Sequence, residues 1–281
     1  MHVRTGLRAA LSVLAAALGA SAPVALAQQP SPDREVVIAT TSSFRDTGLL
    51  DSLLRAFERE TGYRGRAVAV GSGQALRMGE RGDADVLIAH SQAAELAFMR
   101  SGAGSRRLVL AYNHFALAGP PADPARVTAA PSAPEALRRI AAAGAGFVSR
   151  GDSSGTHVRE LALWAQAGGR PAWRGYEETG QGMATTLLVA DERSAYTLTD
   201  RATLASLARR LDLVPLRPPE AALMNVYHVI EVNPEGHPRV NATGARAFAD
   251  WLTSARVQDL IDGFGLPGAR LFFAARGREP E

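Results

Sequence analysis

Residues 148–157 combine the side chains and backbone groups of an anion site. They contain the guanidinium of Arg150 and several hydroxyls, and they stand between a short apolar strand and a helix with apolar residues at helical spacing. Backbone N–H groups at a helix start lack partners within the helix and lie at the positive end of its dipole, which favours an anion. Arg150 adds a permanent charge with forked donors. The turn therefore predicts an oxyanion site, and a capped helix beside a surface arginine is the structural alternative.

The same turn satisfies a second, enzymatic pattern. Residues 151–155 fit the G-x-S-x-G elbow of hydrolases, in which Ser153 would be the nucleophile. That nucleophile needs an acid and then a histidine later in the chain. His228 lies in a predicted strand, and His237 lies in a loop flanked by glycine and proline. A secreted serine hydrolase using Ser153 is therefore the less favoured alternative to a non-enzymatic binding protein.

Two further hydroxyl-rich turns follow predicted strands. Residues 40–43 come after the strand at 35–39, and residues 71–73 come after the strand at 67–70. Ligands bind at the carboxyl ends of such strands, near helix N-termini. Three such turns at one edge favour a small dianion held by neutral dipoles and one arginine. Asp152 is expected to orient Arg150 through a salt bridge, and His157 to pack or cap.

The first 27 residues predict a secretory signal peptide. Arg4 and Arg8 precede an apolar stretch over 11–18, and an A-x-A cleavage pattern ends at Ala27. No cysteine is present, which excludes disulfides, thiol nucleophiles and thiolate metal sites. The expected product is a soluble protein exported to the periplasm.

The basic residues do not indicate nucleic-acid binding. Removing Arg4 and Arg8 takes two from the 31 basic residues and leaves them nearly balanced by 28 acidic ones. All are arginine, and they are scattered without interleaved aromatics. The absence of lysine also removes P-loop phosphate binding and Schiff-base chemistry.

The mature chain alternates strands and helices, which predicts parallel α/β sheets covered on both faces. Two long β-prone segments, 108–118 and 222–232, interrupt this alternation. The economical topology is two α/β lobes joined by these segments as crossing strands, with the C-terminal helices returning to the first lobe. Residues 34–114 and 226–281 would form lobe I, and residues 115–225 lobe II. Proteins of this layout close like a hinge around a ligand.

The chain resembles the periplasmic tungstate-binding proteins of tungstate ABC transporters. Their S-R-G-D-x-S-G-T-H-x-x-E signature is complete over residues 149–160, and their T-T-T-S run appears at 40–43 with Ser42 in place of the third threonine. The similarity covers essentially the whole mature chain and continues through residues 70–75, 81–85 and 196–201. It implies a periplasmic binding protein type II fold, capture of tungstate between the lobes, and delivery to a membrane ABC permease.

The resemblance also implies which residues hold the anion. By position, Thr41, Arg150 and Thr156 are the side-chain ligands, and Ser42 and Ser72 are further positions in the cleft. Two more residues complete the predicted site: Ser154, from the turn, and Tyr196, whose hydroxyl could either aim into the cleft or pack.

The expected ligand is the oxyanion itself, held without metal ligands and without a cofactor. A monomer that binds no nucleic acid is expected. Molybdate and other tetrahedral oxyanions share the charge and shape of tungstate, so a protein selective for one of them remains an alternative.

Overall fold

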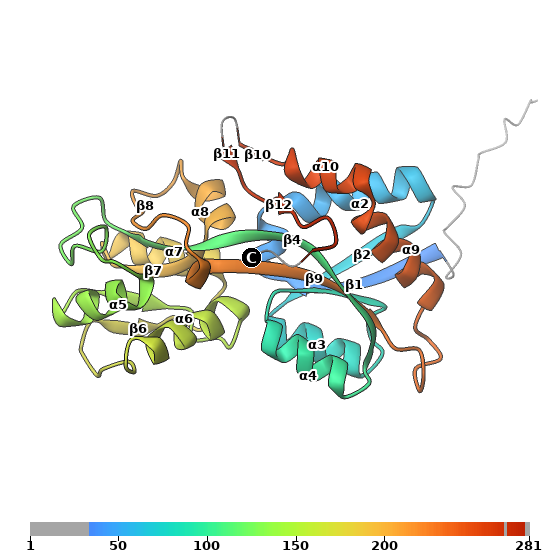
Figure 1. Cartoon of the computed structure of the whole chain (residues 1–281), viewed down its shortest axis with the longest axis horizontal. Helices are drawn as coiled ribbons and strands as arrows, with labels where there is room; N and C mark the ends of the chain where they lie inside the picture. The colour runs from blue at the N-terminus through green and yellow to red at the C-terminus, as the bar shows by residue number, and fades with distance from the viewer. Residues whose placement is uncertain (1–33, 267–268, 279–281) are drawn as a thin grey trace, which may run out of the picture.

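The computed structural model describes residues 34–266 and 269–278, which form two lobes joined by a pair of long strands (Figure 1). The predicted signal peptide, residues 1–27, lies outside the described residues. Within the described ranges, no helix is long and apolar enough to cross a membrane.

The first lobe begins with three parallel strands, each followed by helix. β1 (Glu35–Thr41) lies between β2 (Arg64–Val70) and β3 (Val86–Ala89). Their carboxyl ends, and the helix N-termini that follow, therefore lie along one edge of the sheet. The helices are, in chain order, α1 (Ser42–Asp46) and α2 (Leu49–Thr61) after β1, α3 (Ser72–Glu80) after β2, and α4 (Gln92–Arg100) after β3.

Helix α2 shows how local sequence sets these elements. Leu49, Leu50, Leu53 and Phe57 recur at helical spacing, and all four are buried against the sheet. The helix ends where Gly62 adopts a left-handed φ of 72°, a conformation that glycine takes without strain.

The second lobe is smaller, and its parallel strands are again followed by helices. β5 (Phe147–Ser149) is parallel to β6 (Tyr176–Glu178) and lies beside β7 (Thr197–Asp200) through a bridge from Phe147 to Tyr196. An apolar core that includes Phe147 and Trp164 fills the lobe. Its remaining elements are α5 (Ala133–Ala142), α6 (Gly155–Gln166), α7 (Met183–Glu192), α8 (Arg201–Leu207) and β8 (Val214–Pro215).

Two antiparallel strands, β4 (Gly104–Gly119) and β9 (Met224–Val232), cross between the lobes (Figure 1). β4 pairs with β9 as far as His114, and from Phe115 onward it pairs with β7 and then β8. One strand thus belongs to the sheets of both lobes. The lobe boundaries at 114/115 and 225/226 stay predictions, because both strands run through them without a break.

A buried polar cluster lies where the two strands cross. The carboxylate of Asp200 accepts hydrogen bonds from Asn113 Nδ2 at 2.9 Å, Asn225 Nδ2 at 2.8 Å and Tyr227 Oη at 2.7 Å. His90, directly after β3, bonds through Nδ1 to Asn225 Oδ1 at 2.8 Å. The cluster ties β7 of the second lobe to both crossing strands.

The C-terminal segment returns to the first lobe, as the sequence predicts. Phe248 and Leu252 of α9 and Val257 and Ile261 of α10 join the core that contains α2. The last strand, β12, pairs antiparallel with β4. The bounds are α9 (Ala242–Thr253), α10 (Ala255–Asp262), β10 (Gly265–Leu266), β11 (Ala269–Arg270) and β12 (Phe273–Ala274), with the short helix η2 (Ala221–Leu223) before β9.

The sheets are mixed rather than purely parallel, which corrects the prediction. In the first lobe β9 lies antiparallel to β3, because the crossing strand returns from the second lobe in the opposite direction. Helix α8 ends at Leu207. The chain leaves the helix there, and Leu211 and Leu213 pack with Met183 in a core cluster of the second lobe.

Candidate oxyanion site

The turn between β5 and α6 is held by its own side chains. Ser154 is the N-cap of α6, and its hydroxyl accepts a hydrogen bond from His157 N at 3.3 Å. Asp152 Oδ1 accepts from Ser154 N at 3.1 Å. Gly151 and Ser153 adopt left-handed φ values of 60° and 58°. The capping leaves the hydroxyl hydrogen of Ser154 available to a ligand, since a hydroxyl donates as well as accepts.

Arg150 and Thr156 present buried donors that have no partner among the described residues. Arg150 is 3% exposed and pairs through Nη2 with Asp152 Oδ2, as the sequence predicts, but its Nε bonds nothing among the described residues. Thr156 is 1% exposed, and its Oγ1 is likewise unpaired within the described part of the chain. A buried polar group without a partner costs about 1–3 kcal/mol. Both groups therefore favour a ligand that accepts hydrogen bonds.

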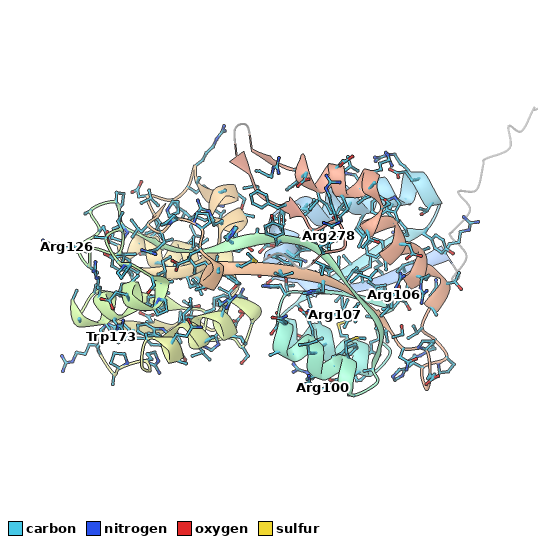
Figure 2. The ribbon with its side chains drawn as sticks, viewed as in Figure 1. Arg100, Arg106, Arg107, Arg126, Trp173 and Arg278 are labelled. Atoms are coloured by element: carbon cyan, nitrogen blue, oxygen red, sulfur yellow. The ribbon has the colours of Figure 1, made fainter. Side chains whose placement is uncertain are left out.

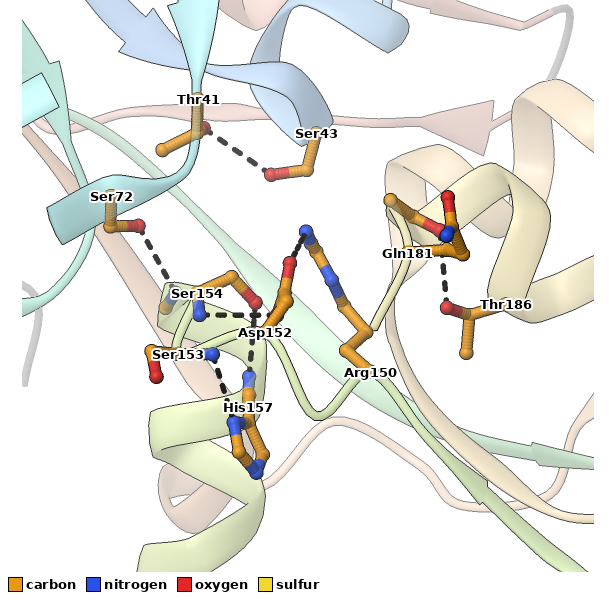
Figure 3. A network of polar contacts seen from close by, with 12 residues as sticks. Thr41, Ser43, Ser72, Arg150, Asp152, Ser153, Ser154, His157, Gln181 and Thr186 are labelled. Atoms are coloured by element: carbon orange, nitrogen blue, oxygen red, sulfur yellow. Dashed lines mark hydrogen bonds and ion pairs between the residues drawn. The ribbon is translucent and has the colours of Figure 1, made fainter. Parts of the chain in front are cut away.

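The first lobe faces this turn with hydroxyls from β1 and α3. Thr41 caps α1, accepting from Phe44 N at 3.3 Å, and Ser43 Oγ donates to Thr41 Oγ1 at 3.3 Å. Figure 3 shows Thr41 and Ser43 on one side of the Arg150 guanidinium and the second-lobe turn on the other. Ser72 Oγ accepts from Gly155 N at 3.0 Å, which joins the two lobes directly.

The structure thus brings together Thr41, Ser72, Arg150, Ser154 and Thr156 in the elements that meet between the lobes. Ser42 is half-buried at the start of α1. Its neighbour Ser43, which the sequence analysis did not assign to the site, is buried on the side of the site that faces Arg150, with its hydroxyl directed at Thr41 (Figure 3). The four-residue hydroxyl run was visible in sequence, but the short helix α1 decides which of its members turns inward.

Tyr196 corrects the predicted site. Its side chain is fully buried in the core of the second lobe, where its hydroxyl donates to Asp123 Oδ1 at 3.0 Å and accepts from Ala125 N at 2.9 Å. Burial raises the pKa of this hydroxyl to about 12. Because both contacts lie inside the lobe, the prediction that Tyr196 binds the anion is wrong and the packing alternative holds.

Two acidic groups lie near the cationic centre. Asp152 partly neutralises Arg150 through their ion pair. Asp46 lies exposed at the end of α1, where partial loss of solvent around its carboxylate raises its pKa while the charges of Arg45 and Arg150 act in the opposite direction. Sequence reasoning missed Asp46, because its electrostatic interaction with Arg150 joins two segments that are far apart in the chain.

The last residue of the signature, Glu160, supports the turn from inside α6. Its carboxylate accepts from Ser149 Oγ at 2.7 Å and from Tyr176 Oη at 2.9 Å. Ser149 Oγ also accepts from Gly151 N at 3.3 Å. Glu160 therefore anchors the residues on either side of Arg150.

The arrangement around Ser153 is not that of a nucleophile and base. Ser153 is exposed, and its backbone N, not its hydroxyl, contacts His157 Nδ1 at 3.0 Å. His228 pairs with Glu95 at 2.9 Å inside the first lobe, and His237 packs against Gly82 there. Both histidines that could complete a triad are thus engaged in the other lobe.

Charged groups elsewhere are dispersed. The arginines labelled in Figure 2 lie on both lobes, with Arg126 on the second lobe and Arg100 and Arg107 on the first. No cluster of three or more His, Cys, Asp or Glu residues with the arrangement of a metal site occurs within the described ranges.

Comparison with known proteins places the chain among binding proteins. The profile of the PBP superfamily domain matches residues 26–256. The tungstate-binding protein TupA of Peptoclostridium acidaminophilum is 44% identical over 243 residues, which covers 84% of each chain. That of Campylobacter jejuni is 38% identical over 234 residues, covering 81% of this chain and 86% of the relative.

Two solved structures extend this similarity to the fold. A structure described as the tungstate ABC transporter from Geobacter sulfurreducens has a TM-score of 0.77 and 41% identity, covering 83% of this chain and 99% of the other. The tungstate-binding protein TupA from Desulfovibrio alaskensis has a TM-score of 0.74 and 43% identity, covering 85% and 98%. These similarities confirm the predicted two-lobed binding-protein fold.

Proposed function

The chain belongs to the family of periplasmic tungstate-binding proteins within the PBP superfamily, and we propose from this premise that it captures tungstate between its lobes. The resemblance seen in the sequence is thereby confirmed at the level of the family. The proposal extends the binding named for the relatives to this chain, and it makes the chain a binding protein rather than an enzyme.

The observation that carries the proposal is the pair of unpartnered donors on one turn. Arg150 Nε and Thr156 Oγ1 are buried and unpaired among the described residues, at the N-terminus of α6. A tetrahedral oxyanion offers acceptors in several directions and so can satisfy both donors together with helix-start N–H groups. The hydroxyls of Thr41 and Ser43 face the same space from the first lobe.

Each donor then has a distinct role. Arg150 supplies the formal charge, in a charge-assisted contact roughly twice as strong as a neutral hydrogen bond. Thr156 and Ser154 donate hydroxyl hydrogens from the second lobe, and Thr41 donates from the first, while Ser43 orients the Thr41 hydroxyl by donating to it. Ser72 holds the lobes together through Gly155 N and can also face the anion. Ser42 stays a secondary candidate.

The biological setting follows from the family. Substrate-binding components of ABC transporters work in the periplasm, and we propose that this chain is exported with cleavage near Ala27 and delivers tungstate to a membrane permease. It would act as a monomer, without a cofactor and without binding nucleic acid.

Calorimetry with the purified mature protein tests the proposal. Tungstate, molybdate and sulfate are titrated separately, and tight binding of tungstate is expected. The same protein is assayed with esterase and phosphatase substrates, and no turnover is expected. Turnover that disappears in Ser153→Ala would instead support the hydrolase alternative, and preferential binding of molybdate would redirect the ligand assignment.

A further inference from the structure

Gly155, the first residue of α6, makes an unusually close contact with the first lobe. A Cβ on this residue would lie 2.8 Å from His90 Cε1 and 3.1 Å from each ring nitrogen of His90. Side-chain carbons in proteins essentially never approach so closely, so an alanine here would force the lobes or the ring to shift. The N–H of Gly155 donates to Ser72 Oγ at 3.0 Å, which places this residue between two first-lobe elements.

Local backbone geometry does not explain the glycine. Gly155 lies within α6 and is absent from the residues of positive φ in the described chain. Alanine is a better helix former than glycine at such a position. The helix by itself would therefore favour alanine, and the contact with His90 is the physical reason for the missing Cβ.

The His90 ring is held on its other side by a ring stack and a hydrogen bond. It stacks on Tyr227 with a centroid separation of 4.8 Å and an angle of 25°. Its Nδ1 bonds to Asn225 Oδ1, and Asn225 Nδ2 faces the Asp200 carboxylate at 2.8 Å. A carboxylate only accepts, so it orients the Asn225 amide and requires the proton on His90 Nδ1. Burial lowers the pKa of His90, which keeps the ring neutral.

The ring thus lies between the polar cluster at the strand crossing and the N-terminus of α6, and contacts both. We propose that the contact of His90 with Gly155 sets how far the two lobes close, and so positions the first-lobe hydroxyls against the Arg150 turn. Both are positioning residues for anion capture. This inference rests on the proposed function, because it assigns to closure the purpose of enclosing the anion.

The first test is Gly155→Ala in the full mature protein. Overpacking of this kind predicts a loss of tungstate affinity of roughly 5- to 150-fold by calorimetry. Gly263→Ala is the matched control. Gly263 also has a helical φ, −81°, but it lies at the end of α10 and its Cβ would meet its nearest atom, Asp259 O, at 3.4 Å. Its affinity should equal that of the wild type.

A double variant tests whether the affinity is lowered by the contact between the lobes or by a local defect in α6. His90→Ala removes the ring, so the double variant His90→Ala/Gly155→Ala should bind tungstate more tightly than Gly155→Ala alone. A defect confined to α6 would not respond to a change in the other lobe. Equal affinity of Gly155→Ala and wild type, or no rescue in the double variant, would overturn the proposal.

Closure itself is measured independently of affinity. The chain has no cysteine, so Leu188→Cys on α7 and Leu260→Cys on α10, both exposed, carry two spin labels without background. The wild type should show a shorter label distance than Gly155→Ala, with the double variant restoring it. If the wild type does not bind tungstate, the proposed function fails, but these distances still test whether the contact of His90 with Gly155 limits closure. Identical distance distributions in wild type and Gly155→Ala would overturn the proposal that it does.

Discussion

At the scale of single residues, the site is defined by what its side chains leave unsatisfied. The hydroxyls of Thr41 and Ser154 already cap helices, and Asp152 already pairs with Arg150. By contrast, Arg150 Nε and Thr156 Oγ1 remain buried without partners among the described residues. Such groups destabilise the ligand-free protein and favour a ligand that accepts their hydrogen bonds. Removing one of these donors should therefore weaken anion binding without lowering the stability of the ligand-free protein.

Thr156→Val tests this expectation, because valine keeps the shape of the threonine side chain and removes its unpaired hydroxyl. The ligand-free variant should be as stable as the wild type or slightly more so in urea unfolding. Its tungstate affinity should fall about 10- to 100-fold, since a hydrogen bond to a charged group contributes roughly 1.5–3 kcal/mol. Thr40→Val is the contrast: Thr40 Oγ1 donates to Ile88 O at 3.1 Å, so this variant should lose about 1 kcal/mol. Equal stability losses in the two variants would contradict the argument.

Arg150 should dominate the affinity. Arg150→Ala is expected to weaken tungstate binding more than Ser72→Ala, measured by calorimetry, because only Arg150 brings a formal charge to the dianion. Arg150→Lys should recover part of the loss, since a point charge does not reproduce the forked guanidinium. Repeating the series in Asp152→Asn removes the repulsion from an unpaired Asp152. Comparable affinities of wild type and Arg150→Ala would show that Arg150 pairs only with Asp152.

At the scale of elements, the Arg150 turn is fixed by the helix that follows it. Glu160 in α6 reaches back to Ser149 at the end of β5, and Tyr176 of β6 donates to the same carboxylate. Burial raises the pKa of Glu160, which its hydrogen-bond donors only partly offset. The strand, turn and helix are thus joined by a carboxyl group that costs stability when ionised.

This cost predicts a pH-dependent effect of Glu160→Gln. A raised folded-state pKa means that the native state binds the proton more tightly than the unfolded state, so wild-type stability falls as pH rises above the ordinary value of 4.5. The amide carries no charge. The variant should therefore gain stability relative to wild type as pH rises from 4.5, and match it below. Glu178→Gln, an exposed carboxylate that Tyr176 also reaches, is the control for urea unfolding at several pH values. A gain independent of pH would refute this role.

At the scale of the whole molecule, two lobes share an interface that an anion can strengthen. Thr41 and Ser72 belong to elements of the first lobe, and Arg150 and Thr156 to elements of the second. A ligand that contacts both sets favours the closed state through its differential affinity for that state. The crossing strands β4 and β9, with the Asp200 cluster between them, are where the bending should be absorbed.

Tungstate should therefore reduce the radius of gyration in small-angle scattering. It should also raise the melting temperature, because binding to the native state at one hundred times Kd adds roughly 2.7 kcal/mol, or roughly 5–11 °C for a chain of this size. Thr156→Ala should weaken both effects together. Superimposable scattering profiles with and without saturating tungstate would mean that the ligand-free protein is already closed or that the donors do not span both lobes.

Features that depend only on neighbouring residues could be predicted from the sequence. The order of strands and helices followed from hydrophobic periodicity, as in α2, and the proposal of an anion-binding turn followed from small residues, hydroxyls and Arg150 beside a helix start. The family signature over residues 149–160 was enough to suggest the proposed function, because it lies in one continuous segment. Local chemistry of this kind needs no knowledge of the rest of the molecule.

Tertiary structure decided the features that depend on contacts between distant segments. It turned Ser43 inward at α1, buried Tyr196 in the second-lobe core, and brought Asp46 toward Arg150. It also placed His90 of the first lobe on Gly155 of the second. The direction of each of these side chains is set by packing against elements far away in the chain, so local periodicity and turn chemistry contain no information about it.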